Sequence, residues 1–397
     1  MTTSNRRIAI LTNTGWNMIR FRRGLVSRLA AEGWEVTALA DFDADQLAAV
    51  RSWGVGAERV EVDGSGTDPF RDLRYLLALL GHYRRLRPTV VHHFSIKPVV
   101  YGSVAAKLAG VPRVVSSITG LGSGFGSERR WLAGVVRALY RAALAGRTLC
   151  VCQNRDDLAR LVETSLVDPG RAVLIPGSGV DTNALRPDPR AREGEPPTFL
   201  MVSRMLWTKG VGEFVAAARR VRSRHASVRF VLIGGCQDDY ASKNADFVPR
   251  AWLEALRREG IVEWLGWTPP EEVEARMRRC TALVHPSYYP EGIPRTLIEA
   301  ASAGVPIITT DSPGCRDAVI PERTGLLCPP RDPEAIASGM LRILGDPEAA
   351  ARMGAAGRRL AEEHFDEQVV LDRLLGVYSN GLGALETGPA RRVSLAM

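Results

Sequence analysis

Short apolar, β-forming runs alternate with amphipathic helical stretches along the whole chain. The first kind of run predicts buried strands and the second predicts helices that cover them. The expected strands are RIAILT, EVTALA, TVVHHF, RVVSSI and TLCVC in the first half, and TFLMVS, VRFVLIG, VEWLG, TALVH and VPIITT in the second. Strands that alternate with helices indicate βαβ units and parallel sheets, so the pattern predicts an α/β protein.

A proline-rich segment, RPDPRAREGEPP (186–197), interrupts this pattern with four prolines and mixed charge, which is typical of a linker. Because 397 residues exceed one ordinary core, we expect two domains, 1–190 and 191–365, followed by a crossover helix and tail, 366–397. Both domains are expected to be doubly wound, Rossmann-like units that face a central cleft. Ligands of such sheets bind at the carboxyl ends of strands. The helical stretch DEQVVLDRLLGVY is expected to pack back across both domains.

Composition narrows the class of protein. Hydrophobic residues make up 45% and charged residues 24%, as in ordinary soluble globular proteins. No apolar run reaches the ~18 residues of a membrane span, and the N-terminus, MTTSNRRIAILTN, does not resemble a signal peptide. The six cysteines form no CxxC pair, and Cys150 and Cys152 are expected to be buried thiols on one face of a strand. These features predict a cytoplasmic, reduced protein without a metal site.

The net charge of +8 is unevenly distributed. Residues 1–190 contain 26 Lys and Arg against 17 Asp and Glu, a balance of +9, whereas the remainder contains 26 against 27, a balance of −1. A basic first half beside a neutral second half suggests that the two halves meet different partners. Nucleic acid is not the expected partner, because no aromatic-rich binding signature or helix-turn-helix pattern accompanies the charge.

A candidate anion site follows the first strand of the second half. In SRMLWTKG (203–210), Arg204 and Lys209 follow the strand TFLMVS closely, and Gly210 opens the next helix. A guanidinium holds a phosphate with two hydrogen bonds, and a lysine adds a compact charge. Surface loops carry many basic pairs, but the position of this pair at the carboxyl end of a strand favours an anion site.

The segment EGIPRTLIEA (291–300) is expected to form the opposite wall of that site. Pro294 is a suitable first helical residue, and the next turn offers backbone N–H groups to a phosphate around Arg295, Thr296 and Leu297. Glu299 lies five residues beyond Pro294, about 7.5 Å along the axis, which suits the ribose of a nucleotide. Glu291 would lie on the other side of the diphosphate, where a sugar would be. The alternative for Glu299 is an acid that binds neighbouring backbone.

These motifs together resemble glycosyltransferase family 4. The resemblance rests on Glu291 and Glu299 with seven residues between them, on SRMLWTKG, and on the glycine-containing loop after the first strand. It implies the GT-B fold, a retaining reaction and a nucleotide-sugar donor. It also implies that Arg204 and Lys209 bind the diphosphate, that Glu299 binds the ribose, and that Glu291 binds the transferred sugar. The base is expected near the GGC turn (234–236) and the backbone of WLGW (264–267).

The resemblance yields a set of predicted site residues. The predicted catalytic residues are Glu291, Arg204 and Lys209. The predicted donor-binding residues are Gly15, Asn17, Arg204, Lys209, Gly234, Gly235, Leu265, Glu291, Gly292, Ile293, Thr296, Leu297 and Glu299. No cofactor or divalent metal is expected, since the two cations and the helix terminus provide the positive charge.

In the first half, TNTGWNMIRFRRGL (12–25) follows the first strand, and Gly15 there allows a close approach to a phosphate or sugar. A simple βα turn explains the same glycine equally well. The segment contains no GxGxxG, which weakens the case for a dinucleotide dehydrogenase.

The segment 92–126 resembles one branch of the family. Thr119 stands where many members carry a histidine, so a catalytic histidine is not transferred to this chain. The combination HxSIKP, YGSxAAKLAGVP and ITGLG resembles the branch that acts on undecaprenyl-diphosphate-linked sugars, including enzymes that add N-acetylgalactosamine to lipid-linked diacetylbacillosamine. The predicted acceptor-binding residues are therefore His93, Lys97 and Thr119. A structural role is the alternative for His93, and it is the expectation for His92.

The stretch ERRWLAGVVRALYRAALAGR (128–147) is predicted to be an amphipathic helix. Trp131, Val135 and Leu139 repeat at four-residue spacing, and Arg130, Arg137 and Arg141 form a second stripe. An ordinary core-facing helix explains this pattern, but a basic amphipathic helix also suits an anionic membrane surface.

The sequence thus predicts a retaining glycosyltransferase that moves a sugar, an N-acetylhexosamine or related hexose, from a UDP-sugar to a lipid-linked saccharide at the inner face of the cytoplasmic membrane. Same-face attack is expected because no general base is well placed. Two alternatives are a UDP-sugar 2-epimerase of the same fold and a non-catalytic nucleotide-sugar binding protein.

Overall fold

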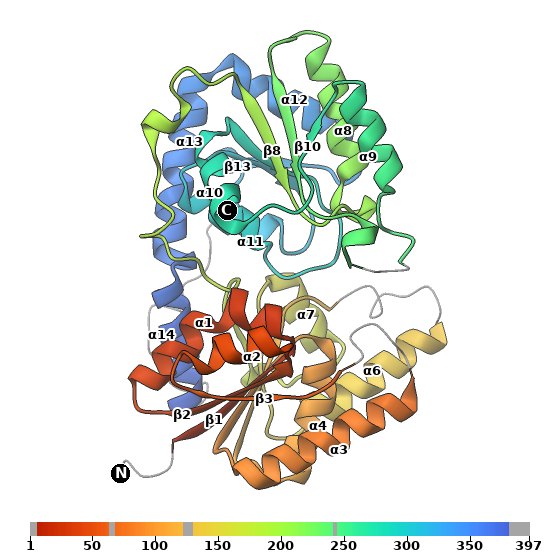
Figure 1. The fold of residues 1–397 in the computed structure, drawn as a ribbon, viewed down its shortest axis with the longest axis vertical. Helices are drawn as coiled ribbons and strands as arrows, with labels where there is room; N and C mark the ends of the chain where they lie inside the picture. The colour runs from red at the N-terminus through yellow and green to blue at the C-terminus, as the bar shows by residue number, and fades with distance from the viewer. Residues whose placement is uncertain (1–5, 63–67, 122–129, 241–243, 381–397) are drawn as a thin grey trace. The chain divides into compact units, whose positions relative to one another are not determined.

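The protein, described here as a computed structural model covering residues 6–62, 68–121, 130–240 and 244–380, folds as two compact units (Figure 1). Unit 1 comprises Met1–Ile175 and Val370–Met397, and unit 2 comprises Pro176–Val369. Parts of three predicted segments lie outside the described residues: the end of 92–126, the start of the helix at 128–147, and the tail 381–397.

Within the described part of unit 1, the strands form one parallel sheet in the order β3-β2-β1-β4-β5-β6-β7. The order reverses direction between β1 and β4, and in doubly wound sheets this switch point is where ligands bind. The strands are β1 (Arg7–Thr14), β2 (Glu35–Asp41), β3 (Gly56–Arg59), β4 (Val90–Phe94), β5 (Arg113–Ile118), β6 (Leu149–Cys152) and β7 (Ala172–Leu174).

Helices cover both faces of this sheet. One face packs against α3 and α4, and the other packs against α1 and the C-terminal helix α14. The described α-helices that lie within unit 1 are α1 (Gly15–Ala31), α2 (Ala44–Arg51), α3 (Pro69–Leu86), α4 (Ser103–Leu108), α6 (Arg130–Leu144) and α7 (Arg155–Glu163). The last described helix, α14 (Glu367–Asn380), begins at the end of unit 2 and belongs to unit 1 from Val370 onward. The chain therefore returns to unit 1 at its end, and α14 places Val370, Leu374 and Tyr378 in the core of that unit.

Unit 2 has a second parallel sheet, in the order β10-β9-β8-β11-β12-β13, which reverses between β8 and β11. Its strands are β8 (Thr198–Val202), β9 (Arg229–Ile233), β10 (Glu263–Trp264), β11 (Ala282–His285), β12 (Ile307–Thr310) and β13 (Gly325–Cys328). Its described helices are α8 (Val211–Arg222), α9 (Arg250–Arg258), α10 (Pro270–Arg279), α11 (Arg295–Ser302), α12 (Pro333–Gly345) and α13 (Pro347–Leu360). Both units are therefore the Rossmann-like domains that the sequence predicts.

All ten predicted strands are present, but β3, β7 and β13 were not predicted. β3, GAER, has one buried residue and two charged ones, so it lacks an apolar run that could identify it. β7 and β13 are three and four residues long. Short strands of this kind are held by pairing with a neighbour rather than by their own pattern.

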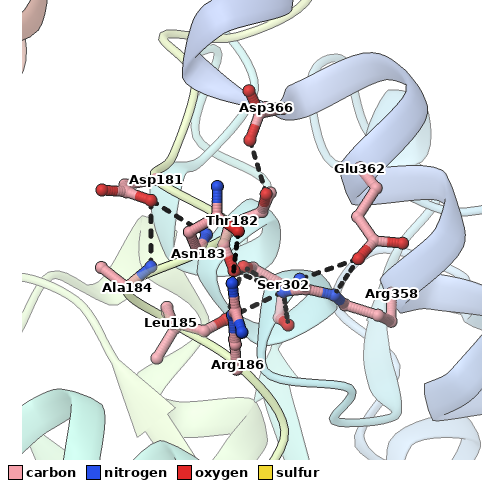
Figure 2. Close-up of polar contacts among 10 residues, drawn as sticks. All are labelled: Asp181, Thr182, Asn183, Ala184, Leu185, Arg186, Ser302, Arg358, Glu362 and Asp366. Atoms are coloured by element: carbon pink, nitrogen blue, oxygen red, sulfur yellow. Dashed lines mark hydrogen bonds and ion pairs between the residues drawn. The ribbon is translucent and has the colours of Figure 1, made fainter.

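The boundary between the units lies at Ile175, earlier than the predicted division at residue 190. The segment from Asp181 to Arg186 is held in unit 2 by Arg358 of α13 (Figure 2). The Arg358 guanidinium donates hydrogen bonds to the carbonyl oxygens of Thr182 at 2.8 Å, Leu185 at 3.1 Å and Ser302 at 2.7 Å. No sequence pattern indicates these backbone contacts. The prolines that follow them are visible in the sequence, and the prediction therefore placed the boundary there.

Candidate active site

The strand order of unit 2 reverses between β8 and β11, and we call this position the switch point. It brings together the loops that follow these two strands. Gly210 ends the first loop with a φ of 82°, and a Cβ there would lie 2.2 Å from the carbonyl oxygen of Pro286 in the second loop. Only glycine permits this approach. The two loops that carry Lys209 and Glu291 are therefore in direct backbone contact.

Lys209 and Glu291 form an ion pair in this contact. The buried ammonium group of Lys209 donates to Oε1 of Glu291 and lies 5.0 Å from the ring centroid of Tyr289. The hydroxyl of Ser287 donates to the same Oε1 at 3.1 Å. The structure thus joins two predicted site residues and adds Ser287 and Tyr289, which the sequence analysis did not identify.

The electrostatics of this pair keep Glu291 ionised. Burial by itself would raise the pKa of the Glu291 carboxyl group, but the positive charge of Lys209, the hydrogen bond that Lys209 donates and the nearby His285 outweigh it, and the pKa falls to about 2. A carboxylate with so low a pKa accepts hydrogen bonds well but is a poor base.

His285, the last residue of β11, lies behind Glu291. Its Nε2 is 3.7 Å from Oε1 of Glu291, longer than a hydrogen bond, and neither ring nitrogen has a hydrogen-bond partner among the described residues. Burial lowers the pKa of this imidazole, although the Glu291 carboxylate opposes the shift. The neutral ring is thus a further polar group close to Glu291, beyond Lys209 and the hydroxyl of Ser287. The sequence placed His285 at a strand end, and that position was the available signal.

Glu299 is buried in α11, one helical turn beyond Arg295. The Arg295 guanidinium donates to Oε1 of Glu299 at 2.9 Å. An i, i+4 partner on the same helix thus reduces the cost of burying the carboxylate.

The first turn of α11 differs in two details from the expectation. The helix begins at Arg295, with Pro294 as its N-cap, and the N–H of Leu297 donates to the carbonyl oxygen of Pro294 at 3.0 Å. The N–H of Leu297 is therefore not free to bind a ligand, because it already forms this i→i−3 hydrogen bond within the first turn. The buried hydroxyl oxygen of Thr296 has no hydrogen-bond partner among the described residues.

The Gly292 loop is fixed by a second glycine contact that the sequence analysis missed. Gly314 has a φ of 78°, and a Cβ there would lie 2.2 Å from the carbonyl oxygen of Gly292 and 2.6 Å from that of Glu291. Gly292 and Ile293 are buried. The backbone that carries Glu291 is thus held against the loop after β12.

The predicted base-binding turn lies beside the loop after β8. Gly234 has a φ of 143°, and a Cβ there would lie 1.7 Å from the carbonyl oxygen of Ser203. The N–H of Met205 donates to the carbonyl oxygen of Gly235 at 2.9 Å, and the N–H of Gly234 donates to that of Gly266 at 2.8 Å. The GGC turn, the backbone around Leu265 and the Arg204 loop therefore form one continuous wall. The Arg204 side chain is exposed on it.

The predicted donor residues of unit 1 lie at its own switch point, after β1. Gly15 and Asn17 are in the first turn of α1, and the N–H of Asn17 donates to the hydroxyl of Thr14 at 3.2 Å. Two further polar residues, Asn13 and Ser95, meet there, with the Ser95 hydroxyl 3.2 Å from Oδ1 of Asn13. Ser95 has a φ of 77°, a strained value for a serine. These two residues are additional candidates for ligand contacts.

His93, a predicted acceptor residue, is fully buried instead. Its Nε2 is hydrogen-bonded to the hydroxyl of Tyr83 at 3.0 Å, and its Nδ1 lies 3.2 Å from the hydroxyl of Ser103 and 3.3 Å from that of Ser116. Burial lowers the pKa of His93 to about 3, so the ring is neutral. Because both nitrogens are occupied inside the core, the geometry does not support an acceptor contact by His93 and favours the structural alternative.

His92 is structural, as expected from its position on the opposite face. Its two nitrogens are hydrogen-bonded to the hydroxyls of Tyr378 at 2.5 Å and Ser117 at 2.7 Å. The contact with Tyr378 links β4 to the C-terminal helix.

Lys97 and Thr119 remain near the surface of unit 1. The Lys97 ammonium donates to Oδ1 of Asp72 at 2.6 Å, and the hydroxyl of Tyr101 donates to Oδ2 of the same acid at 2.6 Å. Asp72 belongs to α3, so this helix positions Lys97. Thr119 is half-buried directly after β5.

The α6 helix buries a different stripe from the one predicted. Its core side consists of Tyr140, Ala143 and Leu144, whereas Val135 is 49% exposed and Leu139 is half-buried. Arg137 and Arg141 are exposed, and the side chains of Arg130 and Trp131 lie outside the described part of the structure. No described helix is long and apolar enough to cross a membrane.

Comparison with known proteins identifies the family. The model of the family described as "Glycosyl transferases group 1" matches residues 184–360, and that of the "Glycosyl transferase 4-like domain" matches residues 18–177. The chain is 30% identical over 312 residues to a glycogen synthase of Mycobacterium tuberculosis, with 76% of this chain and 71% of the relative covered. The chain therefore belongs to this glycosyltransferase family and is a transferase enzyme.

Two further similarities concern the branch and the fold. Over 386 residues the chain is 22% identical to the N,N'-diacetylbacillosaminyl-diphospho-undecaprenol alpha-1,3-N-acetylgalactosaminyltransferase of Campylobacter jejuni, with 94% of this chain and 98% of the relative covered. The crystal structure of Anabaena HepE in complex with UDP and glucose matches with a TM-score of 0.76 at 15% identity, covering 94% of this chain and all of that one. The fold is that of GT-B glycosyltransferases. The relatives include glycosyltransferases that act on lipid-linked sugars or in polysaccharide biosynthesis.

Proposed function

We propose that this protein transfers a sugar, an N-acetylhexosamine or related hexose, from a UDP-sugar to a saccharide linked to undecaprenyl diphosphate. The observation that carries the proposal is the ion pair between Lys209 and Glu291 at the switch point of unit 2. One partner suits a diphosphate and the other suits the hydroxyl groups of a sugar. The names of the Campylobacter relative and the Anabaena complex support the lipid-linked acceptor and the UDP donor, respectively.

Donor binding in this proposal is an exchange of partners. The diphosphate draws the Lys209 ammonium from Glu291, while Arg204 and the hydroxyl of Thr296 bind the remaining phosphate oxygens. Glu291 is then available to the hydroxyl groups of the sugar. Glu299 accepts hydrogen bonds from the ribose hydroxyls, beside its existing contact with Arg295.

In the proposed complex Glu291 does not serve as a general base for the acceptor. Without donor, Lys209 holds its pKa at about 2, and with donor bound its carboxylate is occupied by the hydroxyl groups of the sugar. The acceptor oxygen therefore attacks from the face that the diphosphate leaves. The bond between the anomeric carbon and the phosphate oxygen breaks, the new glycosidic bond forms, and the departing phosphate oxygen takes the acceptor proton.

We propose that no metal ion or other cofactor takes part, because Arg204, Lys209 and the first turn of α11 stabilise the charge on the leaving diphosphate. Transfer is then expected to continue at an unchanged rate in the presence of EDTA. We propose that the reaction takes place at the inner face of the cytoplasmic membrane, where a lipid-linked acceptor meets a nucleotide-sugar.

The test is an assay of UDP release from a panel of UDP-sugars, with and without a short-chain polyprenyl-diphosphate-linked saccharide. The proposal expects release that depends on the acceptor and a product whose anomeric configuration, read by NMR, equals that of the donor. Isomerisation of the UDP-sugar without acceptor would indicate the epimerase alternative, and UDP-sugar binding without turnover would indicate a binding protein.

A further inference from the structure

The helix α3 of unit 1 is apolar on two sides. Tyr75, Leu79 and Tyr83 recur every four residues and are buried against the sheet. Leu77 lies two residues from both Tyr75 and Leu79, which is about 200° around a helix of 3.6 residues per turn. Leu77 is 56% exposed. The side of α3 opposite the core therefore carries a large apolar side chain in solvent.

Two more large side chains share this outward side. Phe70 is 83% exposed and Leu73 is 52% exposed, and with Leu77 they follow the i, i+3, i+7 spacing of a single helical stripe. An ordinary surface helix has polar residues at these positions. Three exposed apolar residues in one stripe indicate a surface that another phase or molecule covers.

The charges on the outward side identify the kind of partner. Arg74 and Arg84 fall on the same side as the apolar stripe and are exposed. The acidic residue within α3, Asp72, lies toward the core side, where it binds Lys97 and Tyr101. An apolar stripe that is flanked by arginines and contains no acidic residue is typical of helices that lie in the headgroup region of anionic bilayers.

We propose that α3, rather than α6, is the element that contacts an anionic lipid bilayer, with Phe70, Leu73 and Leu77 inserted among the acyl chains and Arg74 and Arg84 bound to lipid phosphates. Leu108 of α4, a helix that packs against α3, is also exposed. The bilayer contact of α3 does not depend on the proposed function. Only its role, which is to bring the protein to a lipid-linked acceptor, rests on that function. Because Asp72 of α3 holds Lys97, a bilayer-bound α3 places the Lys97 loop close to a lipid-linked diphosphate.

The experiment is co-sedimentation of the full-length protein with vesicles of phosphatidylglycerol and phosphatidylcholine, and with vesicles of phosphatidylcholine alone, at several salt concentrations. The variants are F70S/L73S/L77S on α3 and the matched V135S/R137Q/R141Q on α6. Thermal unfolding and UDP binding of each variant show that the fold is retained, since none of these side chains is in the core or the candidate donor site.

We expect wild type to bind the anionic vesicles, to dissociate as salt rises, and to bind neutral vesicles at least tenfold more weakly. F70S/L73S/L77S should lose at least tenfold in vesicle binding, and V135S/R137Q/R141Q should stay within about twofold of wild type. Equal binding by wild type and F70S/L73S/L77S, including no binding by either, would overturn the proposal. So would a change from oligomer to monomer in F70S/L73S/L77S, which would assign the stripe to a protein contact. Vesicle binding requires no turnover, so protein that binds through α3 but transfers no sugar would contradict the proposed function alone.

Discussion

Lys209 donates a hydrogen bond to the carboxylate of Glu291, so the cation expected to bind the donor diphosphate is already paired with the acid expected to bind the sugar. The two residues are 82 positions apart and meet because β8 and β11 are neighbours at the switch point. Donor binding must therefore break one contact before it makes others, and this competition has measurable consequences.

The first consequence concerns Glu291→Gln. This change keeps the shape of the side chain and removes the charge that competes for Lys209. We expect UDP to bind at least as tightly as to wild type, measured by calorimetry, while turnover falls tenfold or more because the sugar loses a charged hydrogen-bond acceptor. UDP binding weakened tenfold would mean that Glu291 contacts the nucleotide itself.

Glu299 is expected to act on the ribose. Wild type should bind UDP more tightly than 2′,3′-dideoxy-UDP, and Glu299→Ala should remove most of that preference, since a hydrogen bond to a charged group contributes ~1.5–3 kcal/mol. Arg295→Ala is the control, because it removes the other partner of the Glu299 carboxylate but leaves the acid in place. A preference that persists in Glu299→Ala would show that the acid has only a structural role with Arg295.

The low pKa of Glu291 predicts an acid-sensitive contribution to stability. The pKa is lowered from 4.5 to about 2 in the folded protein, so the unfolded chain takes up a proton at a higher pH than the native one. The contribution is complete above about pH 4.5 and is lost as the pH falls toward 2, and it amounts to roughly 3 kcal/mol. The stability difference between wild type and Glu291→Gln, measured by urea unfolding, should therefore shrink over this range. A difference that stays constant down to pH 3 would contradict the ion pair.

Arg358 predicts a stability effect remote from the chemistry. Its guanidinium bonds the carbonyl oxygens of Thr182, Leu185 and Ser302 and so attaches the first residues of unit 2 to the end of α11 (Figure 2). Arg358→Met should lower the free energy of unfolding by roughly 2–4 kcal/mol, because the buried carbonyls of Thr182 and Ser302 lose the Arg358 donor and that of Leu185 keeps only the Ser302 hydroxyl. The adjacent Arg359 is exposed, so Arg359→Met should change it by less than about 0.5 kcal/mol. Equal effects of the two changes would show that the contacts in Figure 2 do not stabilise the unit.

Sequence patterns predicted the sheets and the loops of the site, because apolar runs identify strands and parallel sheets place ligands at their carboxyl ends. They did not predict which cation neutralises which acid. The pairing of Lys209 with Glu291 depends on strand order, which no local pattern contains. His93 shows the same limit, since the hydroxyls that occupy its ring come from Tyr83, Ser103 and Ser116 on three separate elements.

The surface of unit 1 shows a second kind of limit. The four-residue repeat in α6 predicted an apolar face made of Trp131, Val135 and Leu139. The residues of this helix that are buried in the core are instead Tyr140, Ala143 and Leu144. In α3, two apolar stripes overlap in the sequence, and only burial separates Leu79 in the core from Leu77 in solvent. Periodicity shows that an apolar face exists and does not show which apolar face meets the sheet.

The most direct test of the central claim, that the loops after β8 and β11 bind the diphosphate of a nucleotide-sugar for transfer, is donor binding and turnover in Arg204→Ala and Lys209→Ala. Arg204 is exposed and its removal should leave the fold intact, as checked by thermal unfolding. A charge-assisted phosphate contact contributes ~1.5–3 kcal/mol, so donor affinity should fall about tenfold or more in each variant, with loss of most sugar transfer to the lipid-linked acceptor. Unchanged donor affinity and turnover in both variants would contradict the account.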